Sequence, residues 1–134
     1  MANERIFVID DDNDFLEVCT KRLEANRYRV NRFLNAADAL KAMRSGKPDL
    51  VISDMKMPGL NGLEVCDLLR NNEKTRETPI IIVTGFKGKR EYVESLNTKL
   101  LFFMSKPFES EEFLSTVRTA LDSAYHFDER VGKS

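Results

Sequence analysis

The sequence predicts one α/β domain, built on a parallel β-sheet with helices on both of its faces. Short apolar runs alternate with helical patterns along the 134 residues. The apolar runs are mostly continuous, which indicates strands buried on both faces, as in parallel sheets. Right-handed crossovers then leave only a few doubly wound topologies. We assign residues 1–126 to this domain and residues 127–134 to a short polar tail.

The first half of the chain contains two predicted strands and two predicted helices. Residues 6–9 form an apolar run that ends at three consecutive aspartates. Residues 14–25 are predicted to be a helix, because apolar residues, among them Val18 and Cys19, recur on one face. An alternating run and an asparagine-capped helical pattern predict the next two elements, at residues 28–33 and 35–43.

The second half contains three further predicted strands, each followed by polar residues. They are residues 50–53, 80–83 and 100–104. Apolar spacing predicts helices at residues 63–70 and 109–125. Between the last two strands, residues 87–97 are polar and weakly amphipathic, and two glycines loosen the start of the pattern. We expect this element to be short, shifted or mobile.

The charge balance excludes several classes of partner. The net charge of -1 provides no overall basic field to hold nucleic acid directly. No apolar run is long enough to span a bilayer, and residues 1–5 lack the layout of a signal peptide. We therefore expect a cytoplasmic protein with no membrane insertion.

The two cysteines, Cys19 and Cys66, both lie within apolar helical patterns. We expect them to be buried packing residues in a reducing compartment. Together with the single histidine, His126, they are too few for a zinc site. His126 falls near the end of the last helical pattern and is expected to be a solvated helix residue.

The most informative feature is the set of polar residues at which the apolar runs end. Asp10-Asp11-Asp12 follow the first run, and Asp54, Thr84 and Lys106 follow three others. The carboxyl ends of parallel strands lie at one edge of the sheet, where ligands bind at the point of strand-order reversal. These side chains are therefore expected to converge, although any one of them alone has an ordinary explanation, such as helix capping.

Converging carboxylates repel one another, so Asp10, Asp11 and Asp54 would destabilise the fold unless a cation offsets them. One lysine does not neutralise three carboxylates. Oxygen ligands in an open cleft favour a hard divalent cation, and we expect Mg²⁺ or Mn²⁺. A carboxylate here can attack phosphorus to form an acyl phosphate. Thr84 and Lys106 would then stabilise the oxygens of the transferred phosphoryl group.

Four segments resemble the response-regulator receiver family of two-component signalling, which includes CheY-like proteins. They occur in the family's order, and from the first to the last they span nearly the whole chain: Ile6 to Asp12, Pro48 to Gly62, Ile81 to Gly85, and Phe103 to Phe108. The resemblance implies a flavodoxin-like sheet with five parallel strands in the order 2-1-3-4-5.

The resemblance also implies roles for individual residues. Asp54 matches the phosphoacceptor, and Asp10 and Asp11 match the acidic pair that holds Mg²⁺, Asp11 more directly. Lys56 stands where the family supplies a backbone carbonyl to the metal. Thr84 matches the switch hydroxyl.

Residues on the last strand complete the correspondence. Lys106 matches the lysine that pairs with the phosphoryl group, and the Lys106–Pro107 peptide is expected to be cis. Phe103 stands at the aromatic position whose rotamer is coupled to Thr84. The chain reads Lys99-Leu100 where the family usually has Gly-Ala before this strand.

The function that the resemblance implies is phosphoacceptance rather than turnover of a separate substrate. The expected donor is a sensor histidine kinase or a histidine phosphotransfer protein, and the expected output is a changed affinity for an effector protein or output domain. The unusually apolar last strand leaves open a homodimer through this strand and its flanking helices.

Two other functions remain open on the sequence alone. One is an interaction module with the same fold that works without phosphorylation, favoured by the weak pattern at residues 87–97. The other is a phosphohydrolase of the haloacid-dehalogenase type, because Asp10 and Asp12 form an Asp-x-Asp after a strand.

Overall fold

The computed structural model describes the backbone of residues 3–85 and 99–131, and side chains as far as residue 125. It contains five strands and four helices within this part of the chain. In chain order they are β1 (Arg5–Ile9), α1 (Asn13–Ala25), β2 (Arg29–Phe33), α2 (Ala36–Ala42), β3 (Leu50–Asp54), α3 (Gly62–Arg70), β4 (Ile80–Thr84), β5 (Leu101–Ser105) and α5 (Ser110–Val131).

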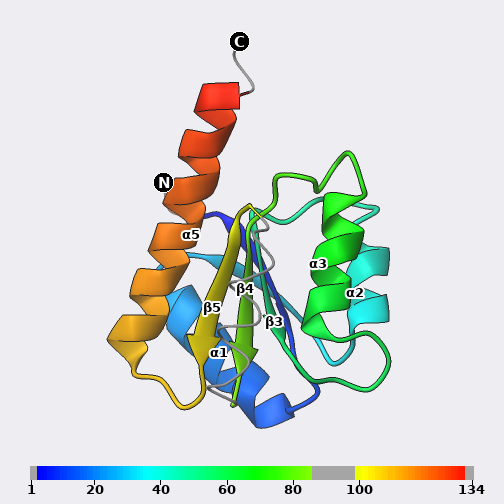
Figure 1. Ribbon diagram of the computed structural model, residues 1–134. Coiled ribbons are helices and arrows are strands. Elements are labelled where there is room, and N and C mark those ends of the chain that lie inside the picture. The colour runs from blue at the N-terminus through cyan, green and yellow to red at the C-terminus, as the bar shows by residue number, and fades with distance from the viewer. Residues whose placement is uncertain (1–2, 86–98, 132–134) are drawn as a thin grey trace.

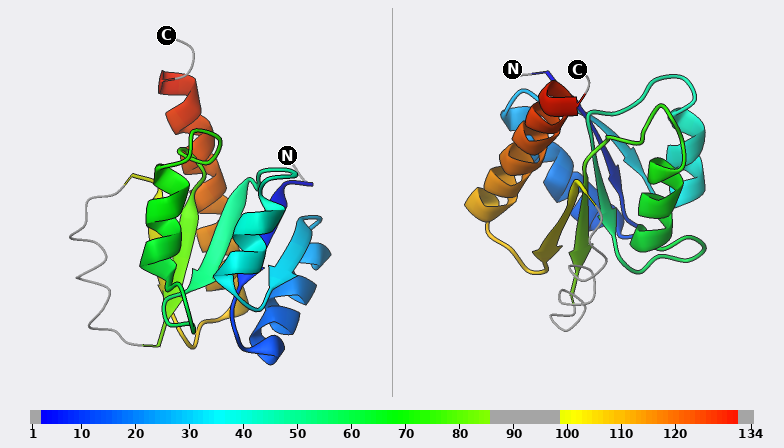
Figure 2. Two further views of the ribbon diagram at one scale, coloured as in Figure 1. Left: turned by 90° about the vertical axis from the view of Figure 1, so that its right-hand side faces the viewer. Right: turned by 45° about the horizontal axis from the view of Figure 1, so that its top comes forward.

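The five strands form one parallel sheet in the order β2-β1-β3-β4-β5. Helices α1 and α5 cover one face of the sheet, and α2 and α3 cover the other (Figures 1 and 2). The predicted doubly wound, flavodoxin-like fold and its strand order are therefore confirmed. The strand order reverses between β1 and β3, which is the place where such sheets bind ligands.

Each face of the sheet has its own hydrophobic core, because alternate side chains of a strand point to opposite faces. In β1, Phe7 and Ile9 pack towards α2 and α3, whereas Ile6 and Val8 pack towards α1 and α5. All four side chains are buried. Burial on both faces is the physical reason why β1, β3 and β4 appear as continuous apolar runs in the sequence.

The helices begin at residues that cap them. Asp12 accepts hydrogen bonds from the first turn of α1, and Asn35 does the same for α2. Asn61 and Glu64 form a capping box at the start of α3. Along α1, Cys19 is buried as predicted, but Val18 is 43% exposed. Val18 therefore lies at the edge of the apolar face rather than within it.

The C-terminal elements differ from prediction at their ends. Helix α5 runs to Val131, beyond the predicted end at residue 125, and the sequence has no helix breaker before Gly132. Strand β5 begins at Leu101 rather than Leu100, which has a φ of 60°. The predicted element at residues 87–97 and the side chain of His126 lie outside the described part of the chain.

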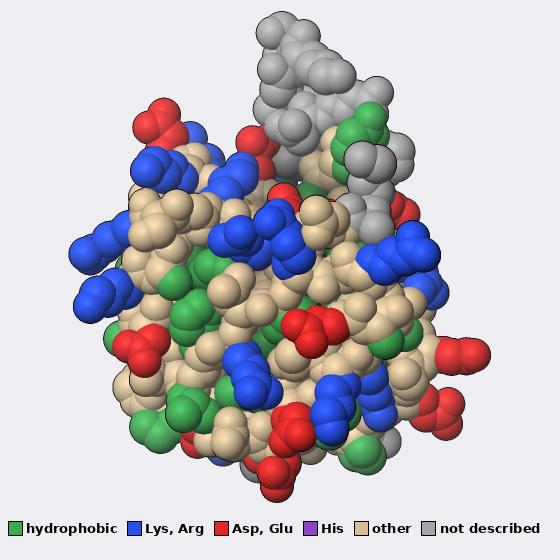
Figure 3. All heavy atoms as spheres, turned by 180° about the vertical axis from the view of Figure 1, so that it is seen from behind, with side chains coloured by type: hydrophobic (Ala, Val, Ile, Leu, Met, Phe, Trp, Pro, Cys, Tyr) green, Lys and Arg blue, Asp and Glu red, His purple; other side chains and the backbone are tan. Residues whose placement is uncertain are grey.

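Charged side chains of both signs are spread over the face seen in Figure 3. No described helix combines the length and the apolar character needed to cross a membrane.

Candidate functional site

The strand register brings the predicted site residues to one edge of the sheet. Ile9 pairs with Ser53, so the residues that follow them, Asp10 and Asp54, end neighbouring strands side by side. Asp54 pairs in turn with Val83, one residue before Thr84.

On the far side, Thr84 pairs with Ser105, and Lys106 comes next along the chain. The backbone N–H of Lys106 donates to the carbonyl of Thr84 at 2.8 Å. Parallel pairing thus places the ends of β1, β3, β4 and β5 together, as the sequence predicted for these four segments.

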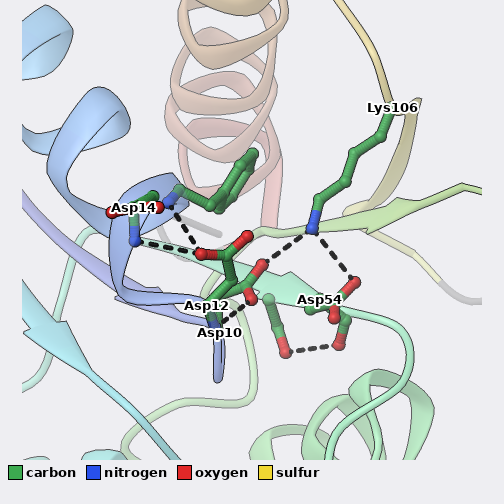
Figure 4. A network of polar contacts seen from close by, with 7 residues as sticks. Asp10, Asp12, Asp14, Asp54 and Lys106 are labelled. Carbon is green, nitrogen blue, oxygen red and sulfur yellow. Dashed lines mark hydrogen bonds and ion pairs between the residues drawn. The ribbon is translucent and has the colours of Figure 1, made fainter.

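Three carboxylates meet at this edge. Ligand atoms of Asp10, Asp11 and Asp54 all lie within 4.8 Å of one another. The Lys106 ammonium reaches into the group from β5, with Nζ 3.0 Å from Asp10 Oδ2 and 3.7 Å from Asp54 Oδ1 (Figure 4). The lysine therefore bridges the carboxylates of two neighbouring strands.

Burial and neighbouring charges shift the pKa values of groups in this cluster. Asp10 is 1% exposed, and besides Lys106 it accepts a hydrogen bond from the backbone N–H of Asp12 at 2.8 Å. Burial and the negative charge of Asp10 raise the pKa of Asp54, against the lowering effect of Lys106. Burial alone would lower the pKa of Lys106, but its hydrogen bond to Asp10 and the charges of Asp10 and Asp54 outweigh burial and raise it.

The three carboxylates fit a hard divalent cation. They supply only oxygen atoms, they come from two strand ends at short range, and the exposed Asp11 and half-buried Asp54 leave one side open. The Lys106 ammonium compensates one of their three negative charges. Burial, with the negative charges of Asp10 and Asp11, raises the pKa of Asp54, and a cation bound there would oppose that effect.

The start of α3 fixes the backbone beside Asp54. Gly62 donates a hydrogen bond to the carbonyl of Met55 at 3.0 Å. A Cβ at Gly62 would lie 2.8 Å from the carbonyl oxygen of Asp54 and 2.9 Å from Ile82 Cδ1, so only glycine fits this close approach. The loop that carries the predicted metal-binding carbonyl of Lys56 is thereby anchored at both ends.

The remaining predicted residues lie close by in the fold. Thr84 is buried at the last position of β4. Phe103 is half-buried on β5, pairs with Ile82 and packs on the core between the sheet and α3. The Lys106–Pro107 peptide is cis, as predicted. Lys56 is exposed in the β3–α3 loop.

Asp12 does not join the carboxylate cluster. Its Oδ1 accepts hydrogen bonds from the backbone N–H groups of Asp14 at 3.0 Å and Phe15 at 3.4 Å, which makes it the N-cap of α1 (Figure 4). The Asp-x-Asp pair that would serve a haloacid-dehalogenase reaction is therefore split between the site and a cap.

One contact at the site was not predicted from the sequence. The Lys106 ammonium lies over the ring of Phe15, with Nζ 4.1 Å from the ring centroid. In the sequence, Phe15 falls within the apolar pattern that predicts the helix at residues 14–25. The only signal for a second role is its position in the first turn of α1, directly after the aspartates.

Comparison with known proteins decides the family. The response regulator receiver domain model matches residues 6–118. The chain belongs to the response-regulator receiver family.

Its relatives extend the comparison. The response regulator MprA of Mycolicibacterium vanbaalenii is 36% identical over 117 residues, which are 87% of this chain and 50% of MprA. The signal receiver domain of a histidine kinase from Syntrophus aciditrophicus has a TM-score of 0.79 at 28% identity, covering 89% of this chain and 90% of that one. CheY4 of Vibrio cholerae has a TM-score of 0.81 at 24% identity, over 89% of this chain and 99% of CheY4, which bears on the fold alone.

This receiver domain spans about half the length of MprA. The response regulator PleD of Caulobacter vibrioides is 28% identical over 115 residues, which are 86% of this chain and 25% of PleD.

Proposed function

We propose that this receiver domain accepts a phosphoryl group on Asp54 and uses the modification to switch its affinity for a partner. The observation that carries the proposal is the cluster of Asp10, Asp11 and Asp54, with ligand atoms within 4.8 Å of one another and the Lys106 ammonium between two of them. A purely structural site would not retain three carboxylates at this spacing, because their repulsion costs stability.

Asp54 is the nucleophile in this proposal. A carboxylate oxygen of Asp54 forms a bond to phosphorus while the bond from phosphorus to the donor breaks, and the donor group leaves with the bonding electrons. In a histidine kinase or phosphotransfer protein, the leaving group is an imidazole nitrogen, which takes up a proton. Burial, with the charge of Asp10, raises the pKa of Asp54, so contacts with cations would favour its charged, nucleophilic form.

Asp10, Asp11 and Asp54 would hold the divalent cation, with the Lys56 carbonyl as a further ligand. Bound there, Mg²⁺ or Mn²⁺ would supply positive charge to the oxygens of the transferred phosphoryl group. Lys106 would pair with one of these oxygens, and the Thr84 hydroxyl would donate a hydrogen bond to another. No separate substrate is turned over, so the reaction is limited to the domain's own phosphorylation and dephosphorylation.

The output would pass through Thr84 and Phe103. A hydrogen bond from Thr84 to the phosphoryl group would pull the end of β4 and open space for the Phe103 ring, which now packs on the core beside α3. The expected reader is an effector protein or an output domain, and β5 with its neighbouring helices is the surface we propose for a partner or a second copy.

Intact-mass measurement with acetyl phosphate and Mg²⁺ tests the proposal. We expect one added phosphate on the wild-type chain, none without divalent cation, and none on Asp54→Asn. Asp12→Asn is the matched control, because Asp12 caps α1 outside the cluster, and it should still be labelled. A wild-type chain that takes no phosphate would favour a module that works without phosphorylation.

A further inference from the structure

The Lys106 ammonium contacts two carboxylates and the face of one aromatic ring. Asp10 and Asp54 attract it as anions, at 3.0 Å and 3.7 Å. The ring of Phe15 meets it with its face, 4.1 Å from the centroid. The face of an aromatic ring carries negative potential, so it attracts a cation at this distance.

The ring of Phe15 is itself fixed by other aromatic rings. It contacts Phe108 edge-to-face, with 5.8 Å between the ring centroids and an interplanar angle of 80°. Phe108 in turn stacks on Phe113, with 5.1 Å between the centroids and an interplanar angle of 12°. Phe113 is fully buried in the core between the sheet and α5. This row of three rings ties the ammonium to the hydrophobic core, through a residue two positions after Lys106.

Packing alone explains Phe113 but not Phe15. Phe113 fills the core and has no exposed surface, whereas Phe15 is half-buried at the edge of that core. An aliphatic side chain such as leucine would cover the same edge. Besides its edge-to-face contact with Phe108, an aromatic ring adds a face that attracts the ammonium.

We propose that Phe15 is a positioning residue for phosphoryl transfer, its ring face holding the Lys106 ammonium beside Asp54 where a phosphoryl oxygen will arrive. This rests on the proposed phosphorylation of Asp54. A lysine side chain has many rotamers, and fixing it before the reaction removes an entropy cost from the transition state. The ring does not touch the reacting atoms and acts only through Lys106.

A fluorination series at Phe15 separates attraction from packing. Replacing Phe15 with 4-fluoro-, 3,5-difluoro- and 3,4,5-trifluorophenylalanine keeps the ring's shape but progressively removes negative potential from its face. We expect the labelling rate with acetyl phosphate and Mg²⁺ to fall stepwise, by about two- to fivefold across the series. The labelling rate of Phe15→Leu should match that of the slowest fluorinated variant, and Phe15→Tyr should retain most of the wild-type rate.

The matched control is the same series at Phe7. The Phe7 ring packs against Phe33 at 5.0 Å on the opposite face of the sheet, so fluorination there should leave the labelling rate unchanged. A second readout is the proton chemical shift of the Lys106 ε-methylene group. The Phe15 ring current should displace this chemical shift from its usual value. Phe15→Leu should remove the displacement, while the amide spectrum remains that of a folded domain.

The two proposals fail in different ways. A wild-type chain that takes no phosphate contradicts the proposed function, while the Lys106 shift still tests whether Phe15 holds the ammonium. If the wild type is labelled but the rate is the same across the Phe15 series and in Phe15→Leu, the positioning role of Phe15 is wrong.

Discussion

The Lys106 ammonium lies 3.0 Å from Oδ2 of Asp10, a side chain that is only 1% exposed. A buried carboxylate needs such a partner, because an uncompensated charge in the interior costs several kcal/mol. Lys106 therefore has a structural role in the resting domain as well as its proposed role in phosphoryl transfer. These two roles can be separated by adding a divalent cation.

Replacing Lys106 by alanine should destabilise the domain most strongly when no divalent cation is present. The expected loss is about 1–3 kcal/mol of unfolding free energy, because Asp10 keeps its burial but loses its ammonium donor. Mg²⁺ should recover part of this loss by replacing the missing positive charge. Urea denaturation with and without Mg²⁺ measures both effects. An equal loss in the two conditions would contradict the idea that Lys106 and the cation compensate the same carboxylates.

Replacing Asp54 by asparagine should have the opposite effect on stability. Burial and the negative charge of Asp10 raise the pKa of Asp54 above its usual 3.8, so the folded chain holds a proton on Asp54 more tightly than the unfolded chain does. The resulting stabilisation is complete below pH 3.8 and is lost as pH rises through the folded-state pKa. At pH 7 the charged Asp54 is therefore a net cost, and Asp54→Asn should raise the unfolding free energy of the metal-free domain.

The same substitution should reduce the stabilisation that Mg²⁺ provides. Thermal unfolding at pH 7 across a Mg²⁺ titration would show this as a smaller increase in Tm for Asp54→Asn than for the wild type. Asp38→Asn is a suitable control, since Asp38 is exposed on α2, away from the cluster. A less stable Asp54→Asn domain without Mg²⁺ would argue against carboxylate repulsion at the site.

Most of the site could be predicted because its residues share one rule. Asp10, Asp54, Thr84 and Lys106 each follow an apolar run, and parallel strands bring such positions to one edge whatever the details of packing. Burial on both faces also made β1, β3 and β4 easy to locate. These predictions depend only on the period of the sequence and on the handedness of the crossovers.

Contacts between side chains from distant segments could not be predicted in this way. Phe15 and Arg70 both fit their helical patterns, so nothing in the sequence marked them as partners of other elements. Whether Phe15 meets Lys106 depends on the angle of α1 over the sheet and on the path after the cis Lys106–Pro107 peptide. Helix orientation and loop path are set by the whole core, not by a local pattern.

Arg70 provides a further prediction, because it joins two loops at the end of the sheet opposite the carboxylates. Its guanidinium donates hydrogen bonds to the carbonyls of Thr78, Lys99 and Leu100 at 2.6–3.2 Å. Arg70 is half-buried, and burial lowers the pKa of its guanidinium from the usual value. Leu100, with its φ of 60°, is among the residues it restrains.

Replacing Arg70 by lysine should therefore cost about 2–3 kcal/mol of unfolding free energy, although the charge is kept. One ammonium does not reproduce the planar set of donors that reaches three carbonyls. Guanidinium chloride denaturation measures the loss, and Arg76→Lys, at an exposed position of the neighbouring loop, is the control. A cost below about 0.5 kcal/mol would show that the donors of Arg70 are dispensable.

Cys19 provides a prediction at alkaline pH. Burial, with a smaller contribution from Asp10, raises the pKa of Cys19 from 9.0 to about 12. Between about pH 9 and about pH 12 the folded chain therefore keeps the thiol protonated, whereas the unfolded chain loses its proton. The unfolding free energy falls as pH rises through this window. The advantage of the wild type over Cys19→Ala should shrink by about 1.4 kcal/mol per pH unit in this window.

Alkylation with iodoacetamide at pH 8 provides a second check on Cys19. The thiol is fully buried, and Cys66 is also buried, so both should react far more slowly in the folded chain than in urea. Mass spectrometry of the intact chain counts the added groups. Native labelling at the rate of the unfolded chain would mean that helix α1 opens readily from the sheet.

Borohydride trapping tests the central claim most directly, because it locates the acyl phosphate on a single residue. Borohydride reduces an aspartyl phosphate to homoserine, so treatment after acetyl phosphate and Mg²⁺, followed by peptide sequencing, identifies the residue that was phosphorylated. We predict homoserine at position 54 alone, and none when Mg²⁺ is withheld. Homoserine at position 10 or 11, or none at position 54 in a chain that has gained phosphate, would contradict the account.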